Sequence, residues 1–350
     1  MNAHPTLAAV AAAAGVSVMT VSKVLRGQGR ISQTVRERVR TEAARLGYRP
    51  NPYAVGLAQA KQGGATRGTL ALLVGHRDAN PLTAKPPHPL HYHYSRMVAG
   101  VRARAEDLGY GLDVFWVFEP GLSERRLGEI LRARGIVGLV LLSVQPSERA
   151  IDWDRYACAG LGRPRRAVVP FAFADFFSAT RLAFLRTHAA GYRRIGLVID
   201  EVHNQLSEGR CLGACVAAQA TCEGAERVKP LVSSGAPLDN VMLERWLKRE
   251  RPDAILFFRN RVPELLAARV TREAEPLKSV DLDLRTRDET TTGVWLPHGR
   301  IGAAGVDLVH MRLNRGERGL EHSPVAVELP GIWWDGLSVT PRSSPGIPSL

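Results

Sequence analysis

The segment from Thr6 to Leu57 constrains the fold more than any other, because three helical patterns follow one another there in close succession. Thr6 precedes an apolar run that Gly15 ends. Ser17 opens a second such run, and Ser32 opens a third. Ser and Thr are favoured at helix starts because their hydroxyls accept hydrogen bonds from the free N–H groups of the first turn. Two short helices joined by a tight turn containing glycine predict a helix-turn-helix unit.

The charge of this segment points to a polyanionic partner. Between Met1 and Gln62 the chain has nine Lys or Arg residues and two acids, a net charge of 9 − 2 = +7 within a total of +13. A small helical domain with such an excess of positive charge is suited to contact phosphates. Nucleic acid is the first interpretation, and another anionic surface is the alternative.

Three blocks of sequence, at their observed spacing, carry a family resemblance: TLAAVAAAAGVSVMTVSKVL, ISQTVRERV and LGYRPNPYAVGL. They closely resemble the DNA-binding headpiece of the lactose-repressor (LacI/GalR) family of bacterial transcription regulators, and a weaker resemblance continues across nearly all of the remaining chain. It implies an all-α headpiece at 1–49, a hinge helix and linker at 50–67, and an effector-binding and dimerisation domain at 68–340. That domain would consist of two discontinuous, doubly wound α/β subdomains, as in a periplasmic sugar-binding protein. The composition of 341–350 predicts a disordered tail.

The resemblance places the second helix in the DNA major groove, with Val18 and Met19 at the two main base-reading positions and Lys23 one turn later. Valine and methionine cannot hydrogen-bond bases, so they would pack on thymine methyl groups, and Lys23 would be the direct donor. The alternative is that Val18 and Met19 belong to the core, although Val21 already supplies part of an inward face. The DNA-binding set that we expect is Thr6, Ser17, Val18, Met19, Thr20, Ser22, Lys23, Arg26, Tyr48, Asn51, Ala54 and Leu57.

The hinge, from Tyr48 to Gln59, folds in the family into a short helix only on the operator. Pro50 and Pro52 limit local hydrogen bonding and explain why the segment would be loose beforehand. Leu57 matches the leucine that family members wedge into the minor groove, where it would kink the duplex. The alternative for Leu57 is packing against the protein's own body.

Beyond residue 68, buried strands alternate with amphipathic helices, and that order predicts parallel sheets with crossover helices. A second unit begins near Asp175, and the last long helix is implied by the resemblance to return to the first unit. Ligands favour the carboxyl ends of such strands. We expect strands at 69–75, 112–118, 138–144, 194–200, 253–258 and 278–284, and helices at 94–108, 123–135, 178–191, 207–222, 238–250 and 299–316.

The resemblance also implies an effector site between the subdomains, at Arg210, Asn260 and Asp283. A guanidinium, an amide and a carboxylate together suit a polyol, so the expected effector is a sugar or sugar derivative. Trp295 would either stack on a sugar face or belong to the core. The chain departs from the family at three further cleft positions, Gly162, Arg261 and Leu296. The alternative therefore remains that the cleft no longer binds a ligand.

We predict no metal site. The four cysteines show no CxxC pair and are expected to be small packed residues. His88, His91 and His93 lie in the stretch KPPHPLHYHYSRM and could bind a metal. A solvated loop near the cleft mouth is favoured, because the prolines argue against a rigid helix and no Cys or acid completes the set.

We also predict no catalysis and no cofactor. The chain has no Walker loop, HExxH, GxSxG or convincing GxGxxG. Asp281 and Asp283 share one face of a predicted strand without an evident base or nucleophile. No apolar run reaches the ~18 residues that span a membrane. The resulting prediction is a DNA-binding transcription regulator, a repressor controlled by a small molecule, which acts as a cytoplasmic, nucleoid-associated homodimer on a pseudo-palindromic operator. One alternative is a DNA-binding repressor or architectural protein that binds no ligand. The other is a sugar-processing enzyme with a fused headpiece.

Overall fold

The computed structural model describes residues 6–25, 31–48, 67–77, 80–85, 91–146, 151–164, 166, 168–233, 238–258 and 277–339. Several predicted features lie outside these ranges: the hinge and linker up to residue 66, the tail at 341–350, and the site residues Arg26, Asn51, Ala54, Leu57 and Asn260.

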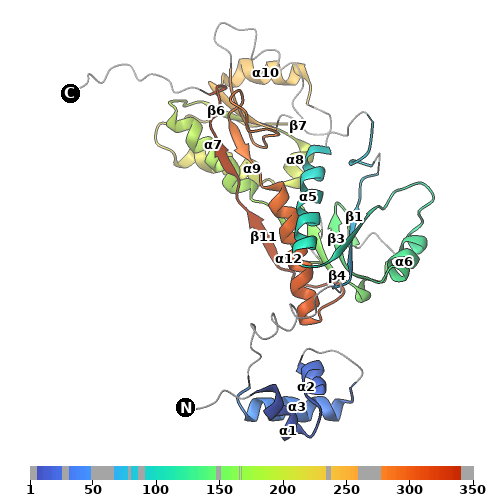
Figure 1. Ribbon diagram of the computed structural model, residues 1–350. Coiled ribbons are helices and arrows are strands. Elements are labelled where there is room, and N and C mark those ends of the chain that lie inside the picture. The colour runs from blue at the N-terminus through green and yellow to red at the C-terminus, as the bar shows by residue number, and fades with distance from the viewer. Residues whose placement is uncertain are drawn as a thin grey trace.

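Three short helices form the headpiece: α1 (Leu7–Ala14), α2 (Val18–Leu25) and α3 (Gln33–Arg45). They enclose a core of their own, in which Val10, Val21 and Val39 have no exposed surface. Figure 1 shows them apart from the body. Within the described ranges no single helix is long and apolar enough to cross a membrane; α1 and α2 reach that length only as a pair, which is bent by 102°.

The starts of the headpiece helices follow the sequence signals with one exception. The Thr6 hydroxyl accepts from the backbone N–H of Ala9 at 3.2 Å, and the Ser17 hydroxyl accepts from that of Thr20 at 3.1 Å. Ser32 occupies the position before α3 but its hydroxyl makes no capping hydrogen bond, which differs from the expectation. Gly15 has a φ of 64°, a left-handed conformation that glycine adopts without strain.

Two six-stranded sheets form the body. The first has the order β11-β5-β4-β3-β1-β2 and is parallel throughout. The second has the order β12-β10-β9-β8-β6-β7 and is parallel except for the pair β10–β12. The strand bounds are β1 (Thr69–Val74), β2 (Gly111–Trp116), β3 (Ile136–Leu142), β4 (Ala157–Leu161), β5 (Phe171–Ala174), β6 (Ile195–Asp200), β7 (Leu231–Ser233), β8 (Ala254–Phe257), β9 (Lys278–Asp281), β10 (Gly293–Trp295), β11 (Ala326–Leu329) and β12 (Ile332–Trp334).

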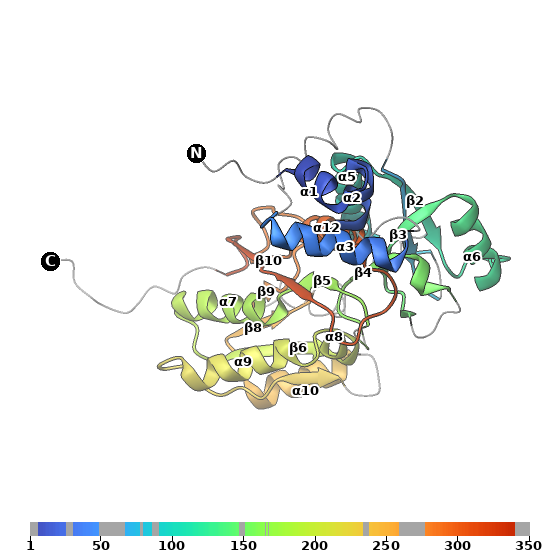
Figure 2. The same cartoon turned by 90° about the horizontal axis from the view of Figure 1, so that it is seen from below.

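Helices cover both faces of each sheet, so each subdomain is doubly wound as predicted. On the first sheet, Leu72 of β1 belongs to the core shared with α5 (His91–Asp107) and α12 (His298–Arg315). Leu73 points the opposite way, into the core under α6 (Glu124–Ala133). On the second sheet, α7 (Phe176–Ala189) and α9 (Arg210–Thr221) pack on the face opposite to α10 (Asn240–Glu250). Figure 2 shows α7 running alongside α9, and the short helix α8 (Glu201–Leu206) contacts α9 as well.

Both subdomains are discontinuous in sequence, as the family resemblance implied. The chain enters the second subdomain at α7, returns to the first through α12, and then crosses once more between β11 and β12. Helix α12 packs against α5 so closely that a Cβ atom on Gly100 would lie 1.9 Å from the backbone oxygen of Gly299. Three crossings therefore join the subdomains, and residues far apart in sequence meet at the boundary.

Two element boundaries differ from the sequence prediction, and both affect candidate site residues. Helix α5 begins at His91, directly after the prolines, so His91 and His93 are helical and not part of a solvated loop. Prolines are tolerated just before and at the first turn of a helix, where no N–H donor is needed. The strand predicted to continue to Leu284 ends at Asp281, so Asp283 lies just beyond the carboxyl end of β9.

Candidate DNA-binding face and ligand site

Helix α2 presents part of its surface to solvent. Val18 is 47% exposed and Met19 is 66% exposed, whereas Val21 and Val24 are buried in the headpiece core. This exposure rules out the alternative that Val18 and Met19 are core residues. Large apolar side chains at such exposure on a small basic domain are a candidate contact surface.

The other predicted DNA-binding residues of the described headpiece fall into two groups. Lys23 is exposed one turn after Met19, and Thr6 and Ser17 are exposed at helix starts, each accepting a backbone hydrogen bond. Thr20 and Ser22 are half-buried, and Thr20 Oγ1 lies 2.9 Å from Ser17 Oγ. Tyr48 packs against the headpiece core, so part of its side chain has a structural role.

Arg210 lies at the start of α9, at the boundary between the subdomains. Its Nη1 lies 3.1 Å from Glu328 Oε2 on β11, and its guanidinium is 5.6 Å from the centre of the Phe173 ring on β5. A second ion pair crosses the same boundary, from Arg163 to Glu208 at 2.5 Å. Arg210 is therefore placed where a ligand could compete with a contact between the subdomains.

Trp295 is half-buried at the end of β10 and is not a core residue. The Arg96 guanidinium lies 3.7 Å from its ring centre, and that of Arg287 lies at 5.0 Å. Cation–π contacts of this kind occupy ring faces that a sugar would otherwise stack on. The next residue, Leu296, has no exposed surface and packs in the core, so it does not line a cleft.

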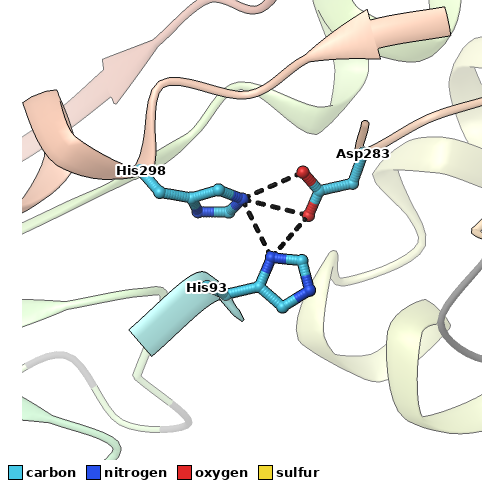
Figure 3. A group of neighbouring side chains, drawn as sticks. All are labelled: His93, Asp283 and His298. Carbon is cyan, nitrogen blue, oxygen red and sulfur yellow. Dashed lines mark hydrogen bonds and ion pairs between the residues drawn. The ribbon is translucent and has the colours of Figure 1, made fainter. Parts of the chain in front are cut away.

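Asp283 lies in a cluster with His93 from α5 and His298 from the first turn of α12, as Figure 3 shows. His298 Nε2 is 2.9 and 3.0 Å from the two carboxylate oxygens. His93 Nδ1 is 3.1 Å from Asp283 Oδ2 and 3.1 Å from His298 Nε2. The Asp283 side chain is only 9% exposed, and both histidines are buried.

The protonation of this cluster follows from burial and from its own charges. Burial acts to raise the pKa of Asp283, but His298 and then His93 outweigh it, so the pKa is below its usual range. Burial lowers the pKa of His93 to about 4, although Asp283 acts in the opposite direction. At neutral pH, Asp283 is therefore ionised and His93 is neutral.

Sequence reasoning found Asp283 and missed its partners. The prolines and the lack of an accompanying acid predict a loop at His93, and the sequence around His298 gives no signal of a site. His93 lies 205 residues before His298, and Asp283 lies 15 residues before it, so no spacing rule connects the three. Among the described residues, no hydrogen bond or ion pair joins Arg210, Asp283 and Trp295 to one another.

A further pocket lies in the first subdomain, at the carboxyl ends of β1 and β2. Val74 and Trp116, the last residues of those strands, line it together with Thr83 and Glu119. None of the predicted effector residues is among its lining residues.

Comparisons with known proteins match both parts of the chain. Residues 6–51 match the model of the family described as bacterial regulatory proteins, lacI family. The regulator CelR of Thermobifida fusca is 30% identical over 201 residues, covering 56% of this chain and 55% of CelR. The lactose operon repressor of Escherichia coli is 31% identical over 190 residues, covering 54% of this chain and 46% of the repressor. The chain thus spans about half the length of the curated relatives it matches.

Solved structures share the fold over almost the whole chain. A CelR–cellobiose complex superposes with a TM-score of 0.53 and 23% identity, over 94% of this chain and 98% of that one. The lac repressor dimer bound to operator and the anti-inducer ONPF superposes with a TM-score of 0.54 and 20% identity, over 96% and 99%.

A helix-turn-helix headpiece followed by two doubly wound subdomains is the architecture that this chain shares with the solved CelR and lac repressor structures. The family that the chain resembles is the lacI family, through the headpiece match at residues 6–51 and the partial matches to CelR and the lactose operon repressor.

Proposed function

We propose that this chain is a sequence-specific DNA-binding transcription regulator, acting as a repressor. The observation that carries the proposal is the outward face of α2, with Val18 and Met19 exposed beside the exposed Lys23. In helix-turn-helix proteins the second helix lies in the major groove and its early residues contact base edges. The positive charge of the first 62 residues supplies the affinity for phosphates that does not depend on sequence.

The chemistry of the three side chains predicts how the bases are read. Val18 and Met19 favour sites with thymine methyl groups and disfavour polar edges that they would leave unpaired. Lys23 donates to a base acceptor, guanine being the strongest candidate. Thr6, Ser17, Thr20 and Ser22 position the helix through the phosphate backbone, as do Arg26 and Tyr48. Asn51, Ala54 and Leu57 belong to the proposed hinge, where Leu57 is the minor-groove wedge.

We propose further that the protein acts as a cytoplasmic homodimer on a pseudo-palindromic operator and responds to a carbohydrate or a derivative of one. The cellobiose complex of CelR supports this class of effector. A ligand that engages Arg210 would compete with Glu328 across the subdomain boundary, and one that stacks on Trp295 would displace Arg96. Losing the Arg210–Glu328 ion pair or the Arg96–Trp295 contact would change how the two subdomains are held together. Such a ligand would therefore bind one relative arrangement of the subdomains more tightly than another, and allosteric control requires this difference in affinity.

The test of the DNA-binding proposal is the selection of bound sites by the full chain, followed by variants. Lys23→Ala should relax preference at one base position and weaken binding there by roughly 5- to 150-fold, the range of one good base contact. Arg40→Ala, an exposed basic change on α3, is the matched control and should weaken all sites alike or leave them unchanged. A uniform loss with Lys23→Ala would show that Lys23 contacts only phosphate. Failure to select any palindrome would reject sequence-specific regulation.

A second candidate is a DNA-binding repressor, or an architectural protein, whose body takes no effector. The favouring observation is that the Asp283 carboxylate lies against two histidines and is nearly buried. Gly162 also has a φ of 79°, so the acid that some relatives place there would be strained. Thermal unfolding with a panel of mono- and disaccharides separates the two, because a ligand that binds only the native state raises its stability. The same panel checks for turnover, which we propose to be absent.

A further inference from the structure

We propose that His93, Asp283 and His298 form a binding site for a divalent transition-metal ion. The inference rests on the geometry of these three side chains and is independent of whether the protein regulates transcription. Each comes from a different element: His93 from α5, Asp283 from the turn after β9, and His298 from the start of α12 (Figure 3). Their donor atoms all lie within 4.8 Å of one another, and the two histidines and the carboxylate face the same point.

The spacing of the donor atoms is that of ligands around one ion. His298 Nε2, His93 Nδ1 and Asp283 Oδ2 form a triangle with sides of 3.0, 3.1 and 3.1 Å. For metal–ligand bonds of ~2.0–2.1 Å, adjacent ligands lie ~2.9 Å apart at octahedral angles and ~3.3 Å apart at tetrahedral angles. The observed sides fall between these values, so small side-chain rotations are enough to admit an ion.

No placement of protons turns all three contacts of this triangle into hydrogen bonds. A neutral imidazole has one N–H, and the ionised carboxylate only accepts. If both histidines donate to Asp283, two N–H groups face each other across the 3.1 Å between the rings. If His93 donates to His298 instead, the lone pairs of His298 and Asp283 oppose each other. A cation at the centre makes all three contacts favourable at once.

The donor set selects the class of metal. Two imidazoles with one carboxylate suit Zn²⁺, Fe²⁺ or Co²⁺, whereas Ca²⁺ and Mg²⁺ prefer sites made of oxygen. Three protein ligands leave at least one position for solvent, as in His₂–carboxylate metal sites.

The location of the site gives metal binding a structural consequence. His93 belongs to the first subdomain, Asp283 follows a strand of the second, and His298 begins the helix that returns from the second to the first. A metal ion would therefore cross-link the two subdomains, and it would stabilise the native body because the unfolded chain does not assemble the site.

The experiment uses the full chain, stripped of metal with a chelator, dialysed and then titrated with Zn²⁺ or Co²⁺. We expect one ion bound per chain by elemental analysis, an absorption band of cobalt bound to nitrogen and oxygen ligands, and a rise in the melting temperature. His93→Gln and Asp283→Asn should each weaken binding by tenfold or more. His310→Gln is the matched control, since His310 lies on the same helix as His298 and contacts Tyr110 instead.

Two results would overturn the proposal: a wild-type chain that binds no ion at saturating metal, or His93→Gln and Asp283→Asn variants that bind as tightly as His310→Gln. The wild-type measurement keeps the test decisive even if a variant fails to fold. Operator binding by the same preparations is recorded separately, so loss of one activity does not count against the other.

Discussion

A single methyl group at Gly100 tests the packing that brings α5 and α12 together. In the Gly100→Ala variant the new Cβ would lie 1.9 Å from Gly299 O and 2.7 Å from Gly299 C. Real Cβ contacts are essentially never shorter than 3.0 Å, so the helices must separate locally by at least about 3.0 − 1.9 = 1.1 Å. The obstacle is backbone, which cannot turn aside as a flexible side chain does.

The expected magnitude is the difference between two opposing effects. Alanine is favoured over glycine inside a helix by ~1 kcal/mol. Forcing an extra carbon into a packed core costs ~1–3 kcal/mol, and a backbone clash belongs at the upper end of that range. We therefore expect Gly100→Ala to lower the free energy of unfolding by roughly 2 kcal/mol, or the melting temperature by roughly 4–8 °C if the body behaves as a domain of ~150–250 residues.

The assay is thermal and urea unfolding of the full chain, followed by circular dichroism. Gly213→Ala is the matched control, because Gly213 lies on α9 and a Cβ there meets nothing within 4 Å. That variant should be more stable than the wild type by up to ~1 kcal/mol from helix propensity alone. We therefore predict that the free energy of unfolding falls in Gly100→Ala and rises in Gly213→Ala. If both variants were equally stabilised, the close approach of α5 and α12 would be refuted.

Two further predictions concern a helix cap and the thiols. Ser17→Ala should increase hydrogen–deuterium exchange of α2 about fivefold, because losing a cap that accepts from Thr20 N–H costs ~1 kcal/mol, whereas Ser32→Ala should change the exchange of α3 little; equal effects would contradict the hydrogen-bond assignment. Burial raises the pKa of Cys158 and of Cys215 to about 12, and also raises the pKa of the buried Cys211 thiol, so these thiols are almost wholly protonated at pH 8. A thiol reagent should therefore modify the half-buried Cys222 first in the native protein and all four cysteines after denaturation, and rapid reaction of two or more native thiols would refute this.

The sequence by itself determined the headpiece and the class of the body. Each headpiece helix is marked by neighbouring residues: Ser17 begins α2, and the 3.6-residue period turns Val21 inward and Met19 outward. These are local effects, which the nearest few residues decide. The alternation of strands and helices likewise predicted parallel sheets, because a parallel sheet needs a crossover helix after most strands, and the family resemblance supplied the two doubly wound subdomains.

The shortest strands could not be found this way. Strands β7, β10 and β12 have three residues each, too few for a period to show. They are strands because the neighbours in the sheet supply hydrogen-bond partners, as β10 does for β12.

Only the tertiary structure decided what surrounds Asp283. Locally, His93 follows several prolines and has no acid beside it, and His298 follows Pro297 in a stretch without any chemical motif. The register of β9, the start of α5 and the return of α12 across the subdomain boundary bring the three together at 2.9–3.1 Å. Helix capping and hydrophobic periodicity involve neighbouring residues and can be recognised in the sequence, whereas a contact such as that between His93 and His298 depends on the packing of whole elements.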